Sequence, residues 1–380
     1  MMKNIEFPNV RVESELMSCV FRLERMRGEL VIGTTPPAVF FELHSLFQFL
    51  SSVISARIEG NHTTLLDALT GVEAAERQSV GDQMREILNV TAAMDWIDEV
   101  IADTPITHTF IRHLHEVVVQ DLVREGDTAP GRYRTADVTI SGAQHKPPAG
   151  FSVQGDMDLL LDFIKRDVQP QFQLIHVALA HHRFVWIHPF GNGNGRVSRL
   201  LSYAMLAKHG FVSPIGLRAV NPTSVFGVAR EEYCSRLAAA DDLSDAGTIS
   251  WCEFFLNGLL LDLDRAHKLQ DIAFVRDRLI APALDRFVAS GRITAIDRDV
   301  LAFVFERVEI RAGELSGILP GSPSVRSQAL RPLIERGLLA PRKEGGRVYH
   351  LAFAPNEFTP FVVNQLDALG FLPPLLKDEH

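Results

Sequence analysis

One stretch of the chain, Ile187-His-Pro-Phe-Gly-Asn-Gly-Asn-Gly-Arg-Val-Ser-Arg199, cannot be explained as ordinary packing. Its glycines alternate with asparagines and lead into a helix that we expect to end at Gly210. Glycine lets the backbone approach a ligand closely and aim successive N–H groups at one point, and a helix N-terminus adds partial positive charge. The stretch therefore predicts a cradle for an anion.

The charged residues of this stretch indicate a polyphosphate guest. Arg196 and Arg199 are three residues apart, so we expect both side chains to leave the same face of the helix and pair with phosphates. His188 precedes the cradle and is suited to accept a proton near neutral pH. The stretch lacks the Gly-Lys-Ser/Thr ending of a Walker loop and the preceding strand of a dinucleotide fold.

Composition describes an ordinary globular chain of more than one domain. It has 380 residues, a net charge of −9 and three cysteines whose spacing fits neither a zinc knuckle nor a disulfide framework. The N-terminus carries charge and proline where a signal peptide has an apolar run, and Leu43–Ala56 is too short for a membrane span. We expect a cytoplasmic protein without membrane association.

Hydrophobic periodicity predicts a mainly α fold. Beyond an N-terminal helix at Ser14–Leu30, helical spacing recurs in Phe40–Arg57, Ile87–Ile101, Phe110–Leu122, Met157–Arg166, Leu174–Val185, Val197–Lys208 and Trp251–Leu279. Between two of these, Pro130–Pro148 alternates β-branched residues around Ser141-Gly142, which predicts a small β-hairpin.

The last part of the chain has a different charge balance. Arg311–His350 carries a net charge of +4, which leaves −13 for the remainder. The pattern predicts three helices (297–307, 312–319 and 324–336) and then a basic hairpin over 338–351, which is the winged-helix arrangement. DNA binding is one possible role, carried by the third helix and the wing, although the surrounding negative charge opposes it. The cations concerned are Arg326, Arg331, Arg336, Arg342, Lys343 and Arg347.

The region from His188 to Arg199 resembles the signature of the Fic family, His-x-Phe-x-Asp/Glu-Gly-Asn-Gly-Arg-x-x-Arg. Ala180–Ile187 resembles the helix that leads into it, and Gly131–Pro148 resembles the flap hairpin against which these enzymes hold a target segment. The resemblance covers roughly residues 40 to 260. It implies a Fic-type helical core with a small hairpin flap, followed by a C-terminal winged-helix domain.

Most family members transfer AMP from ATP to a hydroxyl group of a protein, so the resemblance implies a protein adenylyltransferase. His188 would be the general base that deprotonates a Ser, Thr or Tyr of the target, which could be the chain itself. The Gly193-Asn194-Gly195 segment would hold the α-phosphate region, and Arg196 and Arg199 the outer phosphates. Tyr233 resembles an aromatic residue beside the adenine pocket, and the family often forms homodimers.

The sequence departs from the signature at Asn192, where the family has an acidic residue that positions magnesium. An amide oxygen is a poorer ligand for Mg²⁺ or Mn²⁺ than a carboxylate. Three hypotheses remain open: the ATP phosphates recruit the metal almost alone, the donor nucleotide differs, or transfer is weak.

A second family segment, Ser/Thr-x-x-x-Glu-Gly/Asn, is matched by Ser55–Gly60. The resemblance implies that Glu59 pairs with Arg199 and inhibits the enzyme, because one guanidinium cannot serve a carboxylate and a phosphate fully. Two alternatives remain: a nucleotide-sensing DNA-binding regulator with a weakened site, and an enzyme that removes AMP and uses Glu59 in catalysis.

These considerations divide the chain into five parts. They are an N-terminal helical region, 1–105, with the inhibitory helix at about 40–60; a Fic core, 106–260; a helical linker, 261–294; the winged-helix domain, 295–355; and a C-terminal tail, 356–380.

Overall fold

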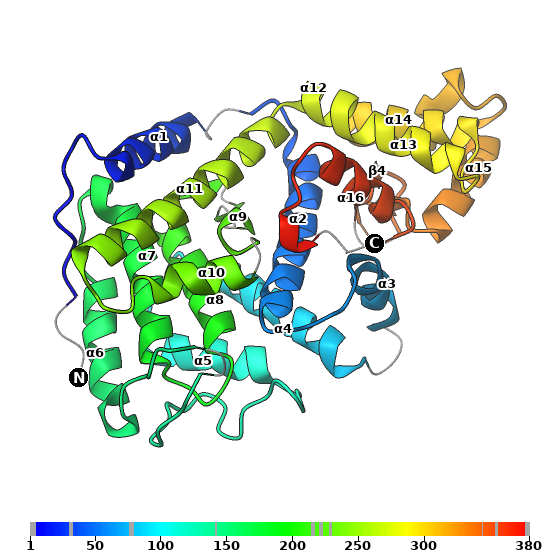
Figure 1. The fold of residues 1–380 in the computed structure, drawn as a ribbon. Coiled ribbons are helices and arrows are strands. Elements are labelled where there is room, and N and C mark those ends of the chain that lie inside the picture. Colours follow the sequence, from blue (N-terminus) through cyan, green and yellow to red (C-terminus); the bar gives the residue numbers. More distant parts are fainter. Residues whose placement is uncertain are drawn as a thin grey trace.

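The structure is a computed structural model that describes residues 5–29, 33–75, 80–140, 143–213, 217–219, 223–227, 230–343, 345–353 and 356–376. The described chain is mainly helical, as expected, with short strands in two antiparallel pairs (Figure 1). Its first half contains α1 (Glu15–Glu29), α2 (Pro37–Ile58), α3 (Leu65–Ala75), α4 (Asp82–Val100), α5 (His108–Val119), the 3-10 turn η1 (Gly150–Ser152), α6 (Val153–Ile164), α7 (Pro170–Ile187) and α8 (Asn194–Lys208).

The second half begins with the strand pair β1 (Val212–Ser213) and β2 (Leu217–Ala219), which the sequence did not predict. Then follow α9 (Thr223–Phe226), α10 (Arg230–Ala238), α11 (Asp245–Leu269), α12 (Ile272–Phe274), the π-helical η2 (Val275–Ile280) and α13 (Ala281–Ala289). The single helix expected over Trp251–Leu279 is therefore wrong. The helix is interrupted because α11 stops at Gln270 and Asp271 starts a new turn by accepting the Ala273 N–H.

Helices α7 and α8 pack against each other at the centre of a helical core, with α5, α6 and α11 around them (Figure 1). Every residue from Leu174 to Ala180 in α7 is buried, and a helix that is enclosed on all sides belongs in the middle of a core. Trp251 of α11 donates its indole N–H to the Ala178 carbonyl at 2.7 Å. This packing fixes the turn that joins α7 to α8.

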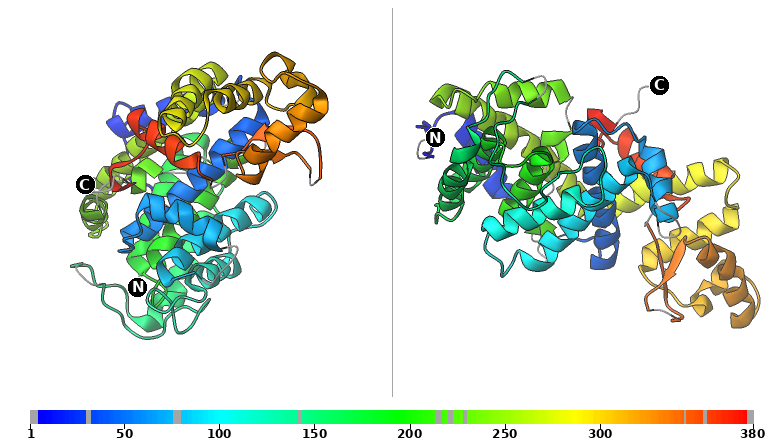
Figure 2. Two further views of the ribbon diagram at one scale, coloured as in Figure 1. Left: turned by 90° about the vertical axis from the view of Figure 1, so that its right-hand side faces the viewer. Right: turned by 90° about the horizontal axis from the view of Figure 1, so that it is seen from below.

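Helix α2 lies between this core and the C-terminal elements (Figures 1 and 2). Thr35, just before it, donates its hydroxyl to the Leu269 carbonyl at the end of α11 at 2.8 Å. At its other end, Arg230 donates to the Ile58 carbonyl at 2.7 Å. By length and composition α2 could cross a membrane, but 65% of its apolar window is buried, which is typical of a core helix.

The flap segment, residues 131–150, differs from the expected hairpin. Its described residues, 131–140 and 143–150, contain no strand, and the expected turn at Ser141-Gly142 lies outside them. The Ala143 N–H donates to the Ile140 carbonyl at 3.2 Å, and other backbone groups of the two arms bond to side chains. The carbonyl groups of Ala136 and Pro148 accept from Arg134, and the Gly150 N–H donates to Asp137.

The last third contains α14 (Ala295–Arg307), the 3-10 helix η3 (Ala312–Gly317), α15 (Pro323–Glu335) and the antiparallel strands β3 (Leu339–Pro341) and β4 (Tyr349–Leu351). These elements occur in the order that the sequence predicts. Ile310 adds a further antiparallel bridge to Tyr349. Helix α14 starts with a capping box, in which Thr294 and Asp297 satisfy each other's backbone N–H groups.

The three arginines expected along the third helix lie on α15 or at its C-terminal cap, and each is engaged by other groups of the chain. Arg326 is buried and donates to the Gly321 carbonyl at 2.9 Å, which satisfies the loop before the helix. Arg331 pairs with Glu335 one turn further along. Arg336 pairs with Glu357 and lies over the Phe287 ring.

Residues 356–380, expected as a tail, contain helix α16 (Thr359–Ala368) and the turn η4 (Pro374–Leu376). The turn η4 lies beside α2, and α16 packs against α13, η2 and α3 (Figures 1 and 2). Phe371 packs against Phe47 of α2 with ring centroids 6.4 Å apart, and the Leu375 carbonyl accepts from Arg57 at 2.7 Å. The end of the chain therefore contacts α2 along much of its length.

Candidate active site

The turn between α7 and α8 holds the residues of the signature. Helix α7 ends at Ile187, and His188 adopts the left-handed conformation, with φ 51° and ψ 63°, which is uncommon for a residue other than glycine. Gly193, with φ 73°, caps the start of α8 in the same conformation. The two left-handed residues bring the histidine to the entrance of the loop whose backbone N–H groups start α8.

His188 is suited to accept a proton. Burial lowers its pKa from 6.5 to about 4, and the nearby charge of Arg134 acts in the same direction. The carbonyl of Val185 and the carboxylate of Glu59 oppose this shift without cancelling it. The imidazole is therefore neutral at physiological pH.

Glu59 and Arg199 form the ion pair that the sequence predicted. Arg199 Nη2 lies 2.7 Å from Glu59 Oε1, and the guanidinium also donates to the Ser55 hydroxyl at 2.9 Å and the Ser55 carbonyl at 3.0 Å. Burial would raise the pKa of Glu59, but the guanidinium groups of Arg199 and Arg196 outweigh it and hold that pKa below its usual value. Glu59 is therefore ionised, and Arg199 is engaged by three acceptors of α2 and its C-terminal cap.

The Glu59 carboxylate lies on the first turn of α8. A Cβ atom added to Gly195 would lie 2.2 Å from Glu59 Oε1 and 3.1 Å from Arg199 Nη1. Only a glycine leaves room for an anion at this distance from the backbone. The carboxylate thus occupies a place at a helix N-terminus where anions are favoured.

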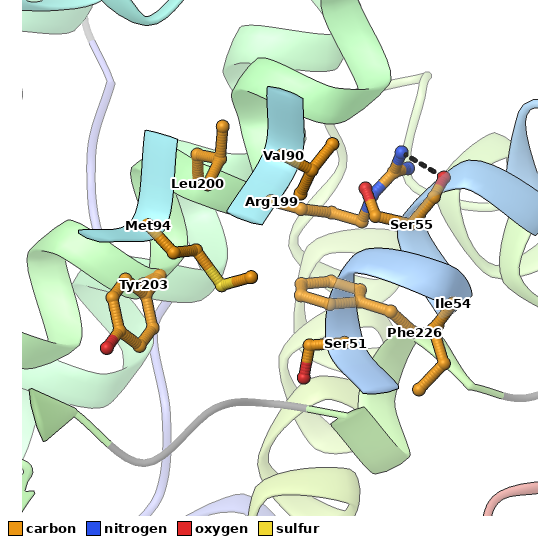
Figure 3. A pocket seen from close by; sticks show the side chains of 9 residues that line it. All are labelled: Ser51, Ile54, Ser55, Val90, Met94, Arg199, Leu200, Tyr203 and Phe226. Atoms are coloured by element: carbon orange, nitrogen blue, oxygen red, sulfur yellow. Dashed lines mark hydrogen bonds between the residues drawn. The ribbon is translucent and has the colours of Figure 1, made fainter. Parts of the chain in front are cut away.

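Beside this ion pair, a small cavity of about 20 Å³ separates α2 from α4 and α8 (Figure 3). It is lined by Ser51, Ile54, Ser55, Val90, Met94, Arg199, Leu200, Tyr203 and Phe226. This volume is enough for about one water molecule and too small for a phosphate group.

Arg196 does not share the position of Arg199. It is fully buried and donates to the Val118 carbonyl at 3.1 Å and the Glu125 carbonyl at 2.7 Å, and it lies 3.3 Å from Glu86 Oε1. The expectation that both arginines project from one face toward the same ligand is wrong for this conformation. Arg196 instead joins the end of α5, the following loop and α4.

The amide of Asn194 is also engaged within the loop. Its oxygen accepts the Phe190 N–H at 2.9 Å and its nitrogen donates to the Phe190 carbonyl at 3.0 Å. The side chain closes the loop on itself, so that the backbone N–H groups of Asn194 and Gly195 are left to face a ligand.

Asn192 does not offer an oxygen ligand to a metal ion. Its Oδ1 accepts the Gly193 N–H at 2.7 Å, and its amide nitrogen lies 3.4 Å from Glu125 Oε2 and from the Gly126 carbonyl. Among the described residues, no group of three or more His, Cys, Asp or Glu could hold a metal. The donor set at this position does not fit the magnesium that the signature implies.

Tyr233, expected beside an adenine base, lies in the core. It is buried, its hydroxyl lies 2.6 Å from His181 Nε2, and its ring packs edge-on against Trp251 and Phe226. Burial lowers the pKa of His181 to about 3, so the pair is neutral. The described ring has no exposed face for stacking, because aromatic neighbours and the core cover it.

Two residues that sequence reasoning missed hold the loop in place. Arg134 donates to the backbone on both sides of His188, and His115 lies parallel to the Phe190 ring, with centroids 3.8 Å apart. His115 Nε2 lies 3.2 Å from the Asn192 carbonyl, and its Nδ1 accepts the Gly131 N–H at 2.9 Å. Both residues bond to backbone groups. Such contacts involve no particular partner residue type, so the spacing of residues in the sequence does not predict them.

Fold and site together define a class of protein: a helical core in which a histidine and a glycine-rich loop join two central helices at an anion-binding helix N-terminus. Residues 105–206 match the model of the Fic/DOC family. Residues 105–206 of this chain are therefore similar to the domain that defines that family.

The curated relatives that match are protein adenylyltransferases named Fic. The one from Nematostella vectensis is 30% identical over 169 residues, which are 41% of this chain and 37% of the relative. The one from Drosophila melanogaster is 33% identical over 169 residues, 41% of this chain and 32% of the relative. The aligned part thus spans about a third of the length of these relatives.

Solved structures share the fold. A Fic family protein from Desulfovibrio desulfuricans G20 superimposes with a TM-score of 0.56 and 20% sequence identity, covering 92% of this chain and 98% of that one. The similarity therefore includes most elements outside residues 105–206.

We predict that His188 stays neutral well below the pH at which a free histidine takes up a proton. Its pKa of about 4 should keep the ring signals of ¹⁵N-histidine-labelled protein at their neutral positions down to about pH 5. The His188 signals would be identified by their loss in His188→Asn. A titration midpoint near 6.5 would contradict the assigned burial effect.

Proposed function

We propose that this protein is an adenylyltransferase that moves AMP from ATP to a hydroxyl group of a protein and is inhibited by Glu59. The observation that carries the proposal is the position of the Glu59 carboxylate, on the first turn of α8 and 2.7 Å from Arg199. A site that holds one anion there is built to hold another. The relatives are named protein adenylyltransferase, and these names support AMP transfer as the reaction.

In the proposed reaction, the backbone N–H groups of Asn194 and Gly195 at the start of α8 hold the phosphates of ATP, since the Gly193 N–H is donated to Asn192. His188, neutral because it is buried, takes the proton from the target hydroxyl. The hydroxyl oxygen forms a bond to the α-phosphorus, the bond from that phosphorus to the bridging oxygen breaks, and pyrophosphate leaves. No step is assigned to a metal, since the Asn192 side chain is turned to Gly193 and Glu125.

Autoinhibition follows from the same contacts. Arg199 gives its donors to Glu59 and Ser55, and a carboxylate and a γ-phosphate cannot both have the full strength of one guanidinium. The cavity beside the pair has room for about one water molecule. Binding of ATP in a productive position therefore requires α2 to move.

The function is tested by incubating variants with α-³²P-labelled ATP and measuring label on protein. Glu59→Gly should raise labelling roughly tenfold or more, and Glu59→Gln, which keeps the shape but removes the charge, should raise it less. In the Glu59→Gly background, Arg199→Ala should remove activity. His188→Ala should lower the rate by about 10² to 10⁴ and change ATP affinity by only a few fold.

The opposite results are equally informative. An inactive Glu59→Gly protein would contradict transfer. If that variant also lost the ability to release AMP from modified protein, Glu59 would be a catalytic residue of AMP removal.

A second prediction concerns the contact between the C-terminal turn and the inhibitory helix. Arg57 donates to the Leu375 carbonyl at 2.7 Å and to the Thr63 carbonyl at 3.1 Å. It therefore links the residues just before and just after the Glu59 turn, and joins them to the C-terminal turn. Arg57→Ala should loosen that turn and raise labelling on the order of fivefold, less than Glu59→Gly does. Arg166→Ala is the matched control, because Arg166 makes a similar bond to the Ile5 carbonyl far from α2. Equal activity of both variants and wild type would exclude this coupling.

A third prediction addresses the metal. Asn192→Asp should make labelling depend on Mg²⁺ or Mn²⁺ more steeply than in the parent, since a carboxylate is the ligand that these ions prefer. Asn192→Ala is the control that removes the amide without adding charge. Identical metal titrations of the Asp variant and the parent would mean that position 192 does not face the ion.

The basic hairpin favours an anionic partner as a second role. Arg342, Lys343 and Arg347 line a concavity with Gly346 and Val348, although Arg342 also pairs with Glu309 at 2.8 Å. If the module acts as a winged helix, duplex DNA should bind with an affinity that falls as salt rises and that weakens in the double variant Arg342→Ala, Lys343→Ala. No binding by the full chain at about 50 mM salt would exclude DNA and leave recognition of a protein.

A further inference from the structure

Arg134 makes an unusual set of contacts at the end of α7. Its Nε donates to the His188 carbonyl at 2.7 Å and its Nη2 to the Ile187 carbonyl at 3.1 Å. Its backbone N–H donates to the Pro189 carbonyl at 2.9 Å. One residue therefore satisfies three successive carbonyl groups at a helix end, where carbonyl groups lack helical partners and a cation is favoured.

The same guanidinium also holds both arms of the flap segment. Nη1 donates to the Ala136 carbonyl at 2.9 Å, and Nη2 donates to the Pro148 carbonyl at 2.7 Å. Where the arms meet, a Cβ atom on Gly150 would lie 2.1 Å from the Thr135 carbonyl oxygen, so the backbones are in close contact. His145 adds one more link from the flap to α7, at 2.8 Å from the Trp186 carbonyl.

These contacts stabilise the backbone conformation of His188. His188 has a left-handed backbone, a conformation that persists in a residue other than glycine only when its surroundings hold it. Arg134 is 8% exposed, so its bonds to the flanking carbonyl groups compete little with water. Its planar, multiply donating group can bond to four carbonyl groups in different directions at once, which a lysine ammonium cannot do with fixed geometry.

We infer that Arg134 is a positioning residue for the transfer reaction, which fixes the His188 imidazole relative to both arms of the flap. The inference rests on the proposed function, in which the flap holds the target segment and His188 deprotonates its hydroxyl. A shift of about 1 Å between base and hydroxyl can cost on the order of 100-fold in rate. Arg134 lies on the α7 side of the loop and contacts neither Arg199 nor Gly195, so its loss should affect the chemical step more than ATP binding.

The test uses the full chain in the Glu59→Gly background, with rates of target labelling measured over ATP concentration. Arg134→Ala should lower kcat on the order of 100-fold and leave the KM for ATP within about threefold. Added guanidinium ion should restore part of the rate of Arg134→Ala. The rate of Arg134→Lys should be lower than the rate of Arg134→Ala with guanidinium added. Arg112→Ala is the matched control, because Arg112 lies over the neighbouring Tyr133 ring at 4.6 Å without bonding to α7.

Three results would overturn the inference: an unchanged kcat in Arg134→Ala, a loss confined to the KM for ATP, or a loss shared equally by Arg112→Ala. Thermal unfolding of each variant distinguishes a folding defect from a loss of positioning. Rescue by guanidinium supports positioning even if Arg134→Ala is less stable.

The histidine titration keeps this inference separate from the proposed function. Because the Arg134 charge lowers the pKa of His188, Arg134→Ala should move its midpoint upward from about 4 in the otherwise wild-type protein. An inactive Glu59→Gly parent would refute the transfer reaction alone. An unmoved midpoint would refute the role of Arg134 beside His188.

Discussion

The ion pair between Arg199 and Glu59 is the interaction on which the arrangement of this protein depends. A guanidinium with 5% exposure must be compensated, and here the compensation comes from a different helix, through the Glu59 carboxylate and the Ser55 hydroxyl and carbonyl. The same carboxylate lies at the N-terminus of α8, which favours an anion. Under the proposed function, a phosphate that binds there replaces both interactions, and the ion pair satisfies Arg199 when no ligand is bound.

The position of α2 makes this ion pair responsive to the rest of the chain. Helix α2 contacts the core on one side and the C-terminal elements on the other, through Glu42 to the Phe353 N–H, Phe47 to Phe371 and Arg57 to Leu375. The cavity next to Arg199 leaves room for about one water molecule where α2 faces α4 and α8. A partner that displaced the C-terminal turn would loosen the helix end that carries Glu59.

Much of this arrangement can be predicted from the sequence, for identifiable reasons. Helices with an apolar repeat on one face, such as α5 and α6, lie within a few residues of their expected bounds, because burial of that face determines them. The pairing of Glu59 with Arg199 was implied by the resemblance of two segments, Ser55–Gly60 and His188–Arg199, to those of the Fic family.

Interactions with backbone groups could not be predicted in the same way. Alternating β-branched residues suggested a hairpin at 130–148, but Arg134 takes carbonyl groups that strand pairing would use. Helical spacing placed Arg196 beside Arg199, yet the carbonyl groups of Val118 and Glu125 and the carboxylate of Glu86 draw it into the core. When the partner of a side chain is a main-chain atom, no particular residue type marks that partner in the sequence, so the contact cannot be predicted from the sequence.

The central claim, that Glu59 and the outer phosphate of ATP compete for Arg199, is tested most directly by calorimetric binding of ATP and of AMP to the wild-type protein and to Glu59→Gln. The competition predicts that the variant binds ATP about tenfold more tightly, a difference of about 1.4 kcal/mol, while its affinity for AMP, which lacks the outer phosphates, stays the same. Equal changes for both nucleotides, or no change for ATP, would contradict it.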